Sequence, residues 1–228
     1  MRRFLASELP TEGHLVTLSI EQSHHLLRVV GIAPNECVIL LDGNGNACEA
    51  QLDSVDRGLA ILRFVSHFQI RDDRPELWMA LALTKPPAFA LALRMLTEIG
   101  VDHIVPVMTE RSQRRNEKSE RWQRIILSAL QQSGRGQLPQ LYPLQTLNDM
   151  MQLCEECTNR FFLHPRMTAL TGPFGGGVAL IGPEGGLSKS EVHMLTEAGW
   201  LGRSLGLSTL RSETAAAVTA GLLLQPTS

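Results

Sequence analysis

Up to about residue 70, hydrophobic positions alternate with polar ones or form short runs. These runs lie at 14–19, 37–43, 47–55 and 58–68, and turn sequences rich in Asp, Asn and Gly separate them at 42–45 and 56–58. A period of two predicts half-buried strands, and turns of this composition join neighbouring strands. We therefore predict a small antiparallel β-barrel, interrupted by one short helix at 21–31.

The period of the pattern changes beyond a polar segment at 71–75. Strand-like apolar runs at 76–84, 102–109, 160–165, 177–182 and 201–207 are separated, in most cases, by helical patterns at 89–100, 119–134, 147–158, 189–200 and 212–225. Such alternation is typical of a mostly parallel sheet with helices on both faces. We predict an α/β protein with two domains, residues 1–72 and residues 73–228.

The composition allows a buried core and argues against a membrane protein. Hydrophobic residues make up 43% of the 228 positions, and no apolar run approaches the roughly 18 residues that span a bilayer. The N-terminal sequence MRRFLASELP has only a fragment of an apolar stretch before Glu8 and Pro10, which is too short for a signal peptide. We therefore expect a cytoplasmic protein with no membrane contact.

The net charge of −2 argues against a general binder of polyanions, but the charges are unevenly distributed. Residues 110–135 hold seven basic side chains against three acidic ones. The basic residues are Arg111, Arg114, Arg115, Lys118, Arg121, Arg124 and Arg135. This stripe is either a contact surface for phosphates or a solvated helix face.

Four cysteines are few for this length, and a cytoplasmic setting keeps them reduced. Cys154 and Cys157 form a C-x2-C pair, a spacing found in half of a zinc site or in a redox pair. The pair falls within the helical pattern at 147–158, where three-residue spacing places two side chains on one helix face. We favour this packing interpretation and predict no metal site.

The sequence Gly-Pro-Glu-Gly-Gly at 182–186 joins a strand to a helix, whose start is marked by the capping pair Ser188 and Glu191. Ligands of parallel sheets bind beyond the carboxyl ends of strands, which is where this loop lies. A phosphate site is disfavoured because Glu184 is negative and the Gly-Lys-Ser order is missing. The loop suits a neutral or positive ligand, such as an adenosine linked to a sulfonium, or else it is a tight corner with a solvated glutamate.

A second corner of similar design lies at 204–218. An apolar segment reaches Leu205 and Gly206, and Arg211 and Glu213 then begin an alanine-rich helix. Glu213 in a first turn is explained by the helix dipole, whereas the dipole disfavours Arg211. We therefore expect Arg211 to meet an external anion, or to be held by Glu213 or Glu184.

These two corners resemble the C-terminal signature of the RsmE family, through IGPEGG at 181–186, LG at 205–206 and LRSETA at 210–215. RsmE proteins are bacterial methyltransferases of the SPOUT superfamily that methylate N3 of a uridine in 16S ribosomal RNA. The resemblance covers nearly the whole chain in an ordered series: HHLLRV at 24–29, LDGNG at 41–45, LTK at 83–85, TEIGV at 97–101, TERS at 109–112, RWQRI at 121–125 and QSGR at 132–135.

The resemblance implies a PUA-like, RNA-binding β-barrel at 1–72 and a SPOUT-type α/β domain with a trefoil knot at 73–228. It implies S-adenosylmethionine as methyl donor, 16S rRNA or the small ribosomal subunit as partner, and a homodimer. For methyl transfer to N3 the candidate catalytic residues are Arg211, which would stabilise negative charge near O2 or O4, and Glu213 or Glu184, which would accept the N3 proton or orient Arg211. The implied cofactor-binding residues are Leu163, His164, Ile181, Gly182, Pro183, Gly185, Gly186, Leu205, Gly206, Leu210 and Thr214.

The RNA-binding residues assigned through the resemblance and the basic stripe are His24, His25, Arg28, Lys85, Arg111, Arg114, Arg115, Gln132 and Arg135. Two alternatives stay open for histidines. His24 and His25 suit an amphipathic helix end equally well, and His164 suits a backbone-bonded strand end as well as a donor pocket.

Three positions depart from the family pattern, because Met95, Gln131 and Ser208 stand where a charged residue is common. Arg94 is a candidate replacement for the cation missing at Met95. An alternative function follows from these departures: an RNA-binding protein that kept the fold and lost or altered methyl transfer.

Overall fold

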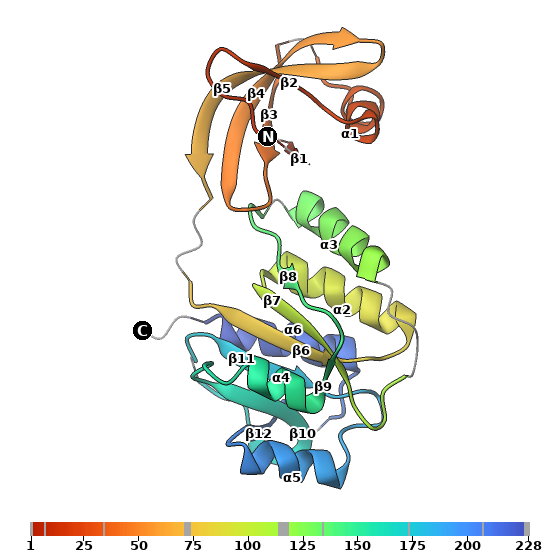
Figure 1. The fold of residues 1–228 in the computed structure, drawn as a ribbon, viewed down its shortest axis with the longest axis vertical. Helices are drawn as coiled ribbons and strands as arrows, with labels where there is room; N and C mark the ends of the chain where they lie inside the picture. Colours follow the sequence, from red (N-terminus) through yellow and green to blue (C-terminus); the bar gives the residue numbers. More distant parts are fainter. Residues whose placement is uncertain are drawn as a thin grey trace. The chain divides into compact units, whose positions relative to one another are not determined.

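The computed structural model describes residues 2–6, 8–33, 35–70, 74–113, 119–133, 135–172, 174–206 and 208–225. The chain forms two compact units, each with its own sheet (Figure 1). Unit 1 contains Met1–Asp72 and Leu130–Leu138, and unit 2 contains Asp73–Ala129 and Pro139–Ser228. The segment 130–138, which the sequence pattern assigned to the second domain, thus groups with unit 1.

Unit 1 holds a five-stranded sheet in the order β1-β3-β4-β5-β2. The strands are β1 (Arg3–Leu5), β2 (Leu15–Thr17), β3 (Cys37–Leu41), β4 (Asn46–Asp56) and β5 (Leu59–Gln69). The β3–β4, β4–β5 and β2–β5 pairs are antiparallel, as predicted, but β1 runs parallel to β3. The expectation of a purely antiparallel sheet was therefore wrong, because a strand of three residues is too short to show a period of two.

The predicted helix at 21–31 is confirmed, although it changes type along its length. An α-helix, α1 (Ile20–His24), runs into a π-helical segment, η1 (His25–Val30). The Ser19 hydroxyl accepts from the backbone N–H of Gln22 and caps α1. Leu26 is fully buried in the core of unit 1, so the helix covers part of that core.

The LDGNG turn of unit 1 forms backbone hydrogen bonds with the segment that follows α3 (Ser119–Ser133). Gly45 N–H donates to the Gly136 carbonyl at 3.0 Å, and Leu138 N–H donates to the Gly43 carbonyl at 2.8 Å. Gly43 has a φ of 78°, and a Cβ atom there would lie 2.8 Å from Leu138 Cδ1. Glycine is required at this position both for the left-handed backbone and for the close approach.

Unit 2 holds a sheet in the order β12-β10-β11-β6-β7-β8, with β9 also paired to β7. Its strands are β6 (Leu77–Ala82), β7 (His103–Met108), β8 (Gln140–Leu141), β9 (Gln145–Thr146), β10 (Arg160–Ala169), β11 (Gly177–Ile181) and β12 (Leu201–Ser204). All of the pairings are parallel, which confirms the prediction for this half of the chain.

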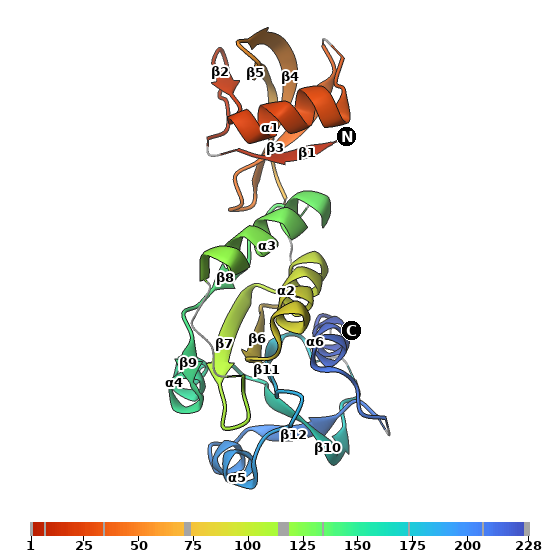
Figure 2. The same cartoon turned by 90° about the vertical axis from the view of Figure 1, so that its right-hand side faces the viewer.

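Helices cover both faces of this sheet. They are α2 (Pro86–Ile99), α4 (Leu147–Leu153), α5 (Lys189–Glu197) and α6 (Ser212–Leu223). Figure 2 shows α2 and α6 on one face and α4 and α5 on the other. Within the described ranges, no helix is long and apolar enough to cross a membrane.

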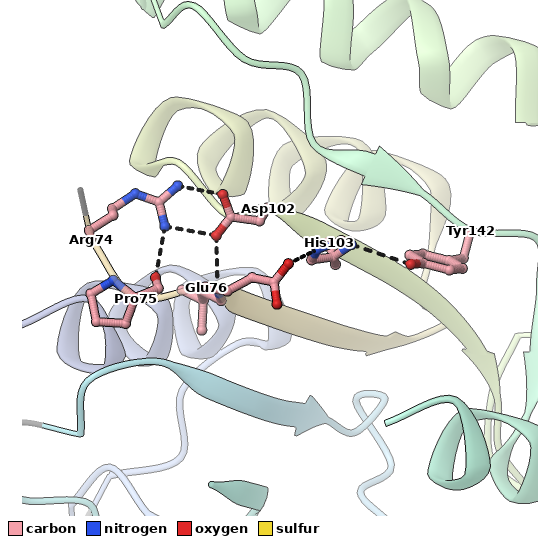
Figure 3. A network of polar contacts seen from close by, with 7 residues as sticks. Arg74, Pro75, Glu76, Asp102, His103 and Tyr142 are labelled. Atoms are coloured by element: carbon pink, nitrogen blue, oxygen red, sulfur yellow. Dashed lines mark hydrogen bonds and ion pairs between the residues drawn. The ribbon is translucent and has the colours of Figure 1, made fainter. Parts of the chain in front are cut away.

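An ion pair closes the amino edge of the unit 2 sheet, where its strands begin (Figure 3). The Arg74 guanidinium donates to both carboxylate oxygens of Asp102, at 2.8 and 2.7 Å. Asp102 also accepts from the backbone N–H of Leu77, the first residue of β6, at 2.8 Å. Because both side chains of the pair are less than 20% exposed, water screens this bidentate contact only weakly.

A series of side-chain hydrogen bonds lies beside this ion pair (Figure 3). His103 Nε2 donates to Glu76 at 2.6 Å, which leaves Nδ1 to accept from the Tyr142 hydroxyl at 3.3 Å. The hydrogen bond from His103 lowers the pKa of Glu76 below its ordinary value. The His103 ring also stacks on Trp78, with centroids 3.8 Å apart. The polar groups at this edge thus satisfy one another.

Candidate functional site

The carboxyl ends of the parallel strands bring the two predicted corners to one edge of the unit 2 sheet. Ile181 ends β11 before the GPEGG loop, and Ser204 ends β12 before the second corner. Only β10 lies between these strands. With neighbouring strands about 4.8 Å apart, the two corners begin roughly 10 Å from each other. Two corners that are separated in sequence therefore lie at one edge of the sheet.

The GPEGG loop closes through its own backbone and then enters α5 by the predicted capping box. Gly186 N–H donates to the Pro183 carbonyl at 2.8 Å. The Ser188 hydroxyl accepts from the N–H of Glu191, and the Glu191 carboxylate accepts from the N–H of Ser188. The two interactions fix the direction in which the chain leaves the loop.

Glu191 also binds a second loop, which the sequence pattern did not indicate. Its Oε1 atom accepts from the backbone N–H of Glu110 at 2.7 Å, while Oε2 accepts from Ser188 at 2.8 Å. The side chain is buried, with 7% of its surface exposed. One buried carboxylate thus ties the loop after β7 to the corner after β11. The capping signature was visible in sequence, but Glu110 lies 81 residues away.

Arg111 reaches the same corner from the loop after β7. Its guanidinium donates to the Gly185 carbonyl at 2.8 Å. A Cβ atom on Gly185 would lie 3.4 Å from Arg111 Cδ, so the side chain runs along the loop. The backbone N–H of Lys85, after β6, makes a long contact of 3.4 Å with Glu184. Three loops are therefore linked, and Arg111, assigned to RNA through the resemblance, touches the candidate cofactor loop.

The second corner is held by a side chain from the end of β12. The Ser204 hydroxyl donates to the Gly206 carbonyl at 3.1 Å and accepts from the Gly206 N–H at 3.2 Å. Gly206 has a φ of 127°, and a Cβ atom placed there would meet nothing within 4 Å. Gly186, at φ 68°, likewise faces open space. One glycine in each corner thus leaves room next to the backbone.

Arg211 and Glu213 differ in exposure at the start of α6. Arg211 is exposed at the N-cap position, with no side-chain capping bond. Glu213 is buried, at 8% exposure, and accepts from the Ser212 hydroxyl at 3.3 Å. Within the parts of the chain that the structure describes, no hydrogen bond or ion pair joins Arg211 to Glu213 or Glu184. Of the two sequence-based options, an external anionic partner is therefore the better supported.

Strand β10 is interrupted by a bulge that begins at His164. Leu163 and Thr168 both lie opposite Arg203 of β12, so four residues bulge out between them. His164 Nδ1 donates to the carbonyl of the adjacent Pro165 at 2.6 Å, which is the backbone-bonded arrangement. Arg166 adopts a positive φ of 71° within the bulge. The strand is also longer than the predicted 160–165 because its pairing with β12 continues after this bulge.

The other residues assigned to the cofactor differ in burial. Ile181 and Pro183 are buried, Gly182 and Leu205 are partly exposed, and Leu210 and Thr214 are exposed. The RNA-binding residues assigned in unit 1 include His24, His25 and Arg28, which are exposed on α1 and η1, and Gln132, which is exposed on α3. The ring of His25 packs edge-on against Phe4, with centroids 5.7 Å apart. Arg135 is partly exposed, and Arg114 and Arg115 lie outside the described residues.

Two arginines of the basic stripe, Arg121 and Arg124, lie on the solvent side of α3. Arg121 and Arg124 are exposed, whereas Ile126 and Ala129 are buried. Arg124 lies 4.0 Å from Glu120, one helical turn away, and both side chains are more than 70% exposed. Such exposed pairs contribute little to stability. This face is therefore available to a polyanion without the loss of a strong internal contact.

Comparison with known proteins identifies the class. The RNA methyltransferase domain family matches residues 72–224. The fold and this match together define an RNA methyltransferase. Ribosomal RNA small subunit methyltransferase E of Synechocystis sp. is 32% identical over 218 residues, covering 89% of this chain and 70% of that protein. The chain therefore belongs to the ribosomal RNA small subunit methyltransferase E (RsmE) family.

Two solved structures share this fold over nearly their full length. One is the ribosomal RNA small subunit methyltransferase E from Neisseria gonorrhoeae bound to S-adenosyl methionine, with a TM-score of 0.85, 28% identity, and coverage of 96% of this chain and 95% of that one. The other is a methyltransferase from Legionella pneumophila in complex with the same cofactor, with a TM-score of 0.85, 27% identity, and coverage of 96% and 94%.

Proposed function

We propose that this protein transfers a methyl group from S-adenosylmethionine to N3 of a uridine in the 16S RNA of the small ribosomal subunit. Family membership supports the reaction class, and the structure from Neisseria gonorrhoeae was determined with S-adenosyl methionine bound. The observation that carries the proposal is the convergence of three loops on GPEGG, next to the corner at Leu205 and Gly206. The choice of N3 as the methylated atom is inferred from the family and not from the geometry of these loops.

The residues at this edge fit such a donor. Gly186 and Gly206 face open space, where a side chain would occupy the room that a ligand needs. The Glu184 side chain is exposed at the corner and suits a sulfonium or an amino group. Backbone amides and carbonyls of the two corners suit a ribose and an adenine edge. Bound S-adenosylmethionine supplies an electrophilic methyl group.

The chemical problem lies on the base, because N3 of uridine carries a proton and is a poor nucleophile until that proton leaves. Arg211 suits the task of stabilising the negative charge that develops on O2 or O4, since it is cationic, exposed and without a described ion pair. Glu213 or Glu184 accepts the proton, or orients Arg211. Glu213 is buried and accepts a hydrogen bond from Ser212, whereas Glu184 is exposed, so the two carboxylates differ in access to solvent.

The wider architecture proposed for the chain follows the family. Unit 1 acts as a PUA-like RNA-binding domain, and unit 2 as a SPOUT methyltransferase domain with a trefoil knot. The enzyme works in the cytoplasm as a homodimer.

The test is methyl transfer from labelled S-adenosylmethionine to small subunits, or to their free RNA, from a strain that lacks the native enzyme. Label is expected at N3 of one uridine, located by nuclease digestion and mass spectrometry. RNA binding without incorporation would instead support the non-catalytic alternative suggested by Met95, Gln131 and Ser208. Calorimetry with S-adenosylhomocysteine and with ATP provides the control, and tighter binding of ATP would contradict the proposed donor site.

A further inference from the structure

The C-x2-C pair lies at the amino edge of the unit 2 sheet, in the turn that links α4 to β10. The predicted helix at 147–158 ends earlier than expected, at Leu153, so the two cysteines do not share a helix face. Cys157 N–H donates to the Cys154 carbonyl at 3.2 Å. A turn closed in this way keeps the two Cα atoms within about 7 Å. Most disulfides span about 4.4–6.8 Å between Cα atoms, so the backbone is compatible with a bond between these residues.

The two thiols differ in access to solvent. Cys154 is fully buried, whereas Cys157 is partly exposed. The Cys154 side chain is the largest cause that lowers the pKa of Cys157, whereas the Cys157 side chain and burial raise the pKa of Cys154. Burial and the charges of Glu76 and Glu156 act to raise the pKa of Cys157, and the Arg160 guanidinium acts to lower it, with a net downward shift. The accessible sulfur is thus the more nucleophilic one, and the protonated sulfur lies behind it.

The other two cysteines lack this arrangement. Cys37 and Cys48 lie on β3 and β4 of unit 1, where Cys37 is opposite Gln51 and Cys48 is opposite Leu40. Burial is the largest cause that raises the pKa of each thiol. Cys37 is partly exposed, like Cys157. It therefore serves as an internal reference thiol that is also partly exposed and has the opposite pKa shift.

We propose that Cys154 and Cys157 form a reversible redox dithiol that exchanges with the disulfide of a small thiol such as glutathione. The turn geometry and the unequal burial of the two cysteines carry this proposal. It is independent of the methyl transfer proposed above, because the carboxyl edge of the sheet contributes neither sulfur.

The exchange proceeds in two balanced steps. The Cys157 thiolate attacks one sulfur of the small disulfide, which forms a mixed disulfide and releases one thiolate. The Cys154 sulfur then attacks Cys157 Sγ, which forms the internal bond and releases the second thiolate. The two protons lost by the protein thiols protonate the two released molecules, and the two electrons reduce the small disulfide.

The experiment incubates the full-length protein in mixtures of reduced and oxidised glutathione, followed by acid quenching, alkylation and peptide mass spectrometry. The peptide that contains both cysteines is expected to lose two hydrogen atoms as the mixture becomes oxidising, without keeping glutathione, and to recover them with dithiothreitol. In the reduced protein, Cys157 should react with iodoacetamide at least about fivefold faster than Cys37 at neutral pH.

Two variants separate the roles of the sulfurs. Cys154→Ser should trap glutathione on Cys157, and Cys157→Ser should leave Cys154 unmodified, while Cys37→Ser should behave like the wild type. The proposal is overturned if no internal disulfide forms in excess oxidised glutathione, or if Cys157 and Cys37 react at equal rates. The comparison of alkylation rates uses the wild-type protein, so it tests the proposal even if a substitution impairs folding.

Discussion

The two edges of the unit 2 sheet differ in the partners of their charged side chains. At the amino edge, Arg74 is paired with Asp102, and Glu76 with His103 (Figure 3). At the carboxyl edge, Glu191 and Arg111 bind backbone groups of neighbouring loops, and Arg211 is exposed. The first edge closes the sheet by satisfying its own charges. The second uses charged side chains to hold neighbouring loops together, and it leaves Arg211 exposed.

This contrast shows how one sheet can separate stability from function. Loops after parallel strands contribute backbone donors and acceptors that a substrate can use, whereas the strand starts have to be anchored. Paired charges in a partly buried setting resist substitution because removal of one leaves the other unpaired. Substitutions at the two edges should therefore change different measurements.

The largest effect is expected at Arg211. Arg211→Ala should lower kcat by about a hundredfold to a thousandfold, because it removes a cation from the site where charge develops on the base. Donor affinity, measured by calorimetry with S-adenosylhomocysteine, should change little. Arg211→Lys, which keeps the charge, should retain more activity than Arg211→Ala. A parallel loss of donor affinity would move Arg211 into the cofactor site instead.

At the opposite edge, Asp102→Ala should reduce the free energy of unfolding by about 2–3 kcal/mol, since Arg74 and Leu77 N–H both lose their acceptor. Urea denaturation measures this loss. Donor affinity of the folded fraction should stay at the wild-type value. If Asp102→Ala weakened donor binding while leaving stability intact, this would contradict the proposal that the amino edge contributes stability and the carboxyl edge binds the donor.

Glu191→Gln tests the buried carboxylate that ties two loops together. Glutamine offers one acceptor oxygen, and its amide group would face a backbone N–H, so one of the two contacts is lost. We expect donor affinity to fall about tenfold, equivalent to about 1.4 kcal/mol. Lys189→Gln, on the exposed first turn of α5, is the matched control and should bind the donor normally.

Arg111→Ala separates a loop contact from an RNA contact. If its bond to Gly185 dominates, donor affinity should fall about fivefold, because the loop loses one hydrogen bond from a charged group. RNA binding should then keep its salt dependence. If Arg111 binds a phosphate, donor affinity should persist, and the slope of the logarithm of RNA affinity against the logarithm of salt concentration should change by about one.

The smallest effect is expected from Glu76, which is exposed. The hydrogen bond from His103 lowers its pKa in the folded protein, so it contributes stability at pH values above its unfolded pKa of about 4.3. That contribution is lost as the pH falls through the folded pKa. Glu76→Gln should therefore lose less stability on acidification than the wild type, as measured by urea denaturation at a series of pH values. An equal loss in both proteins would exclude this contribution.

Long and strongly periodic segments were predictable from sequence. The parallel strands of unit 2, the helix after GPEGG and its capping box were all indicated by local patterns, because burial of one face and satisfaction of helix ends are local requirements. The short strands β1, β8 and β9 were missed because two or three residues cannot establish a period. The cysteine turn was misread as helix because its spacing also fits a helix face.

The sequence by itself therefore determined the family, the order of the longer helices and strands, and the two corners of the candidate site. Only the tertiary structure decided which distant groups meet: Glu191 with Glu110, Arg111 with Gly185, and the segment 136–138 with the LDGNG turn. The reason is physical. A hydrogen bond between loops depends on strand order and register, which place residues far apart in the chain within 3 Å, and neither is encoded in a local period.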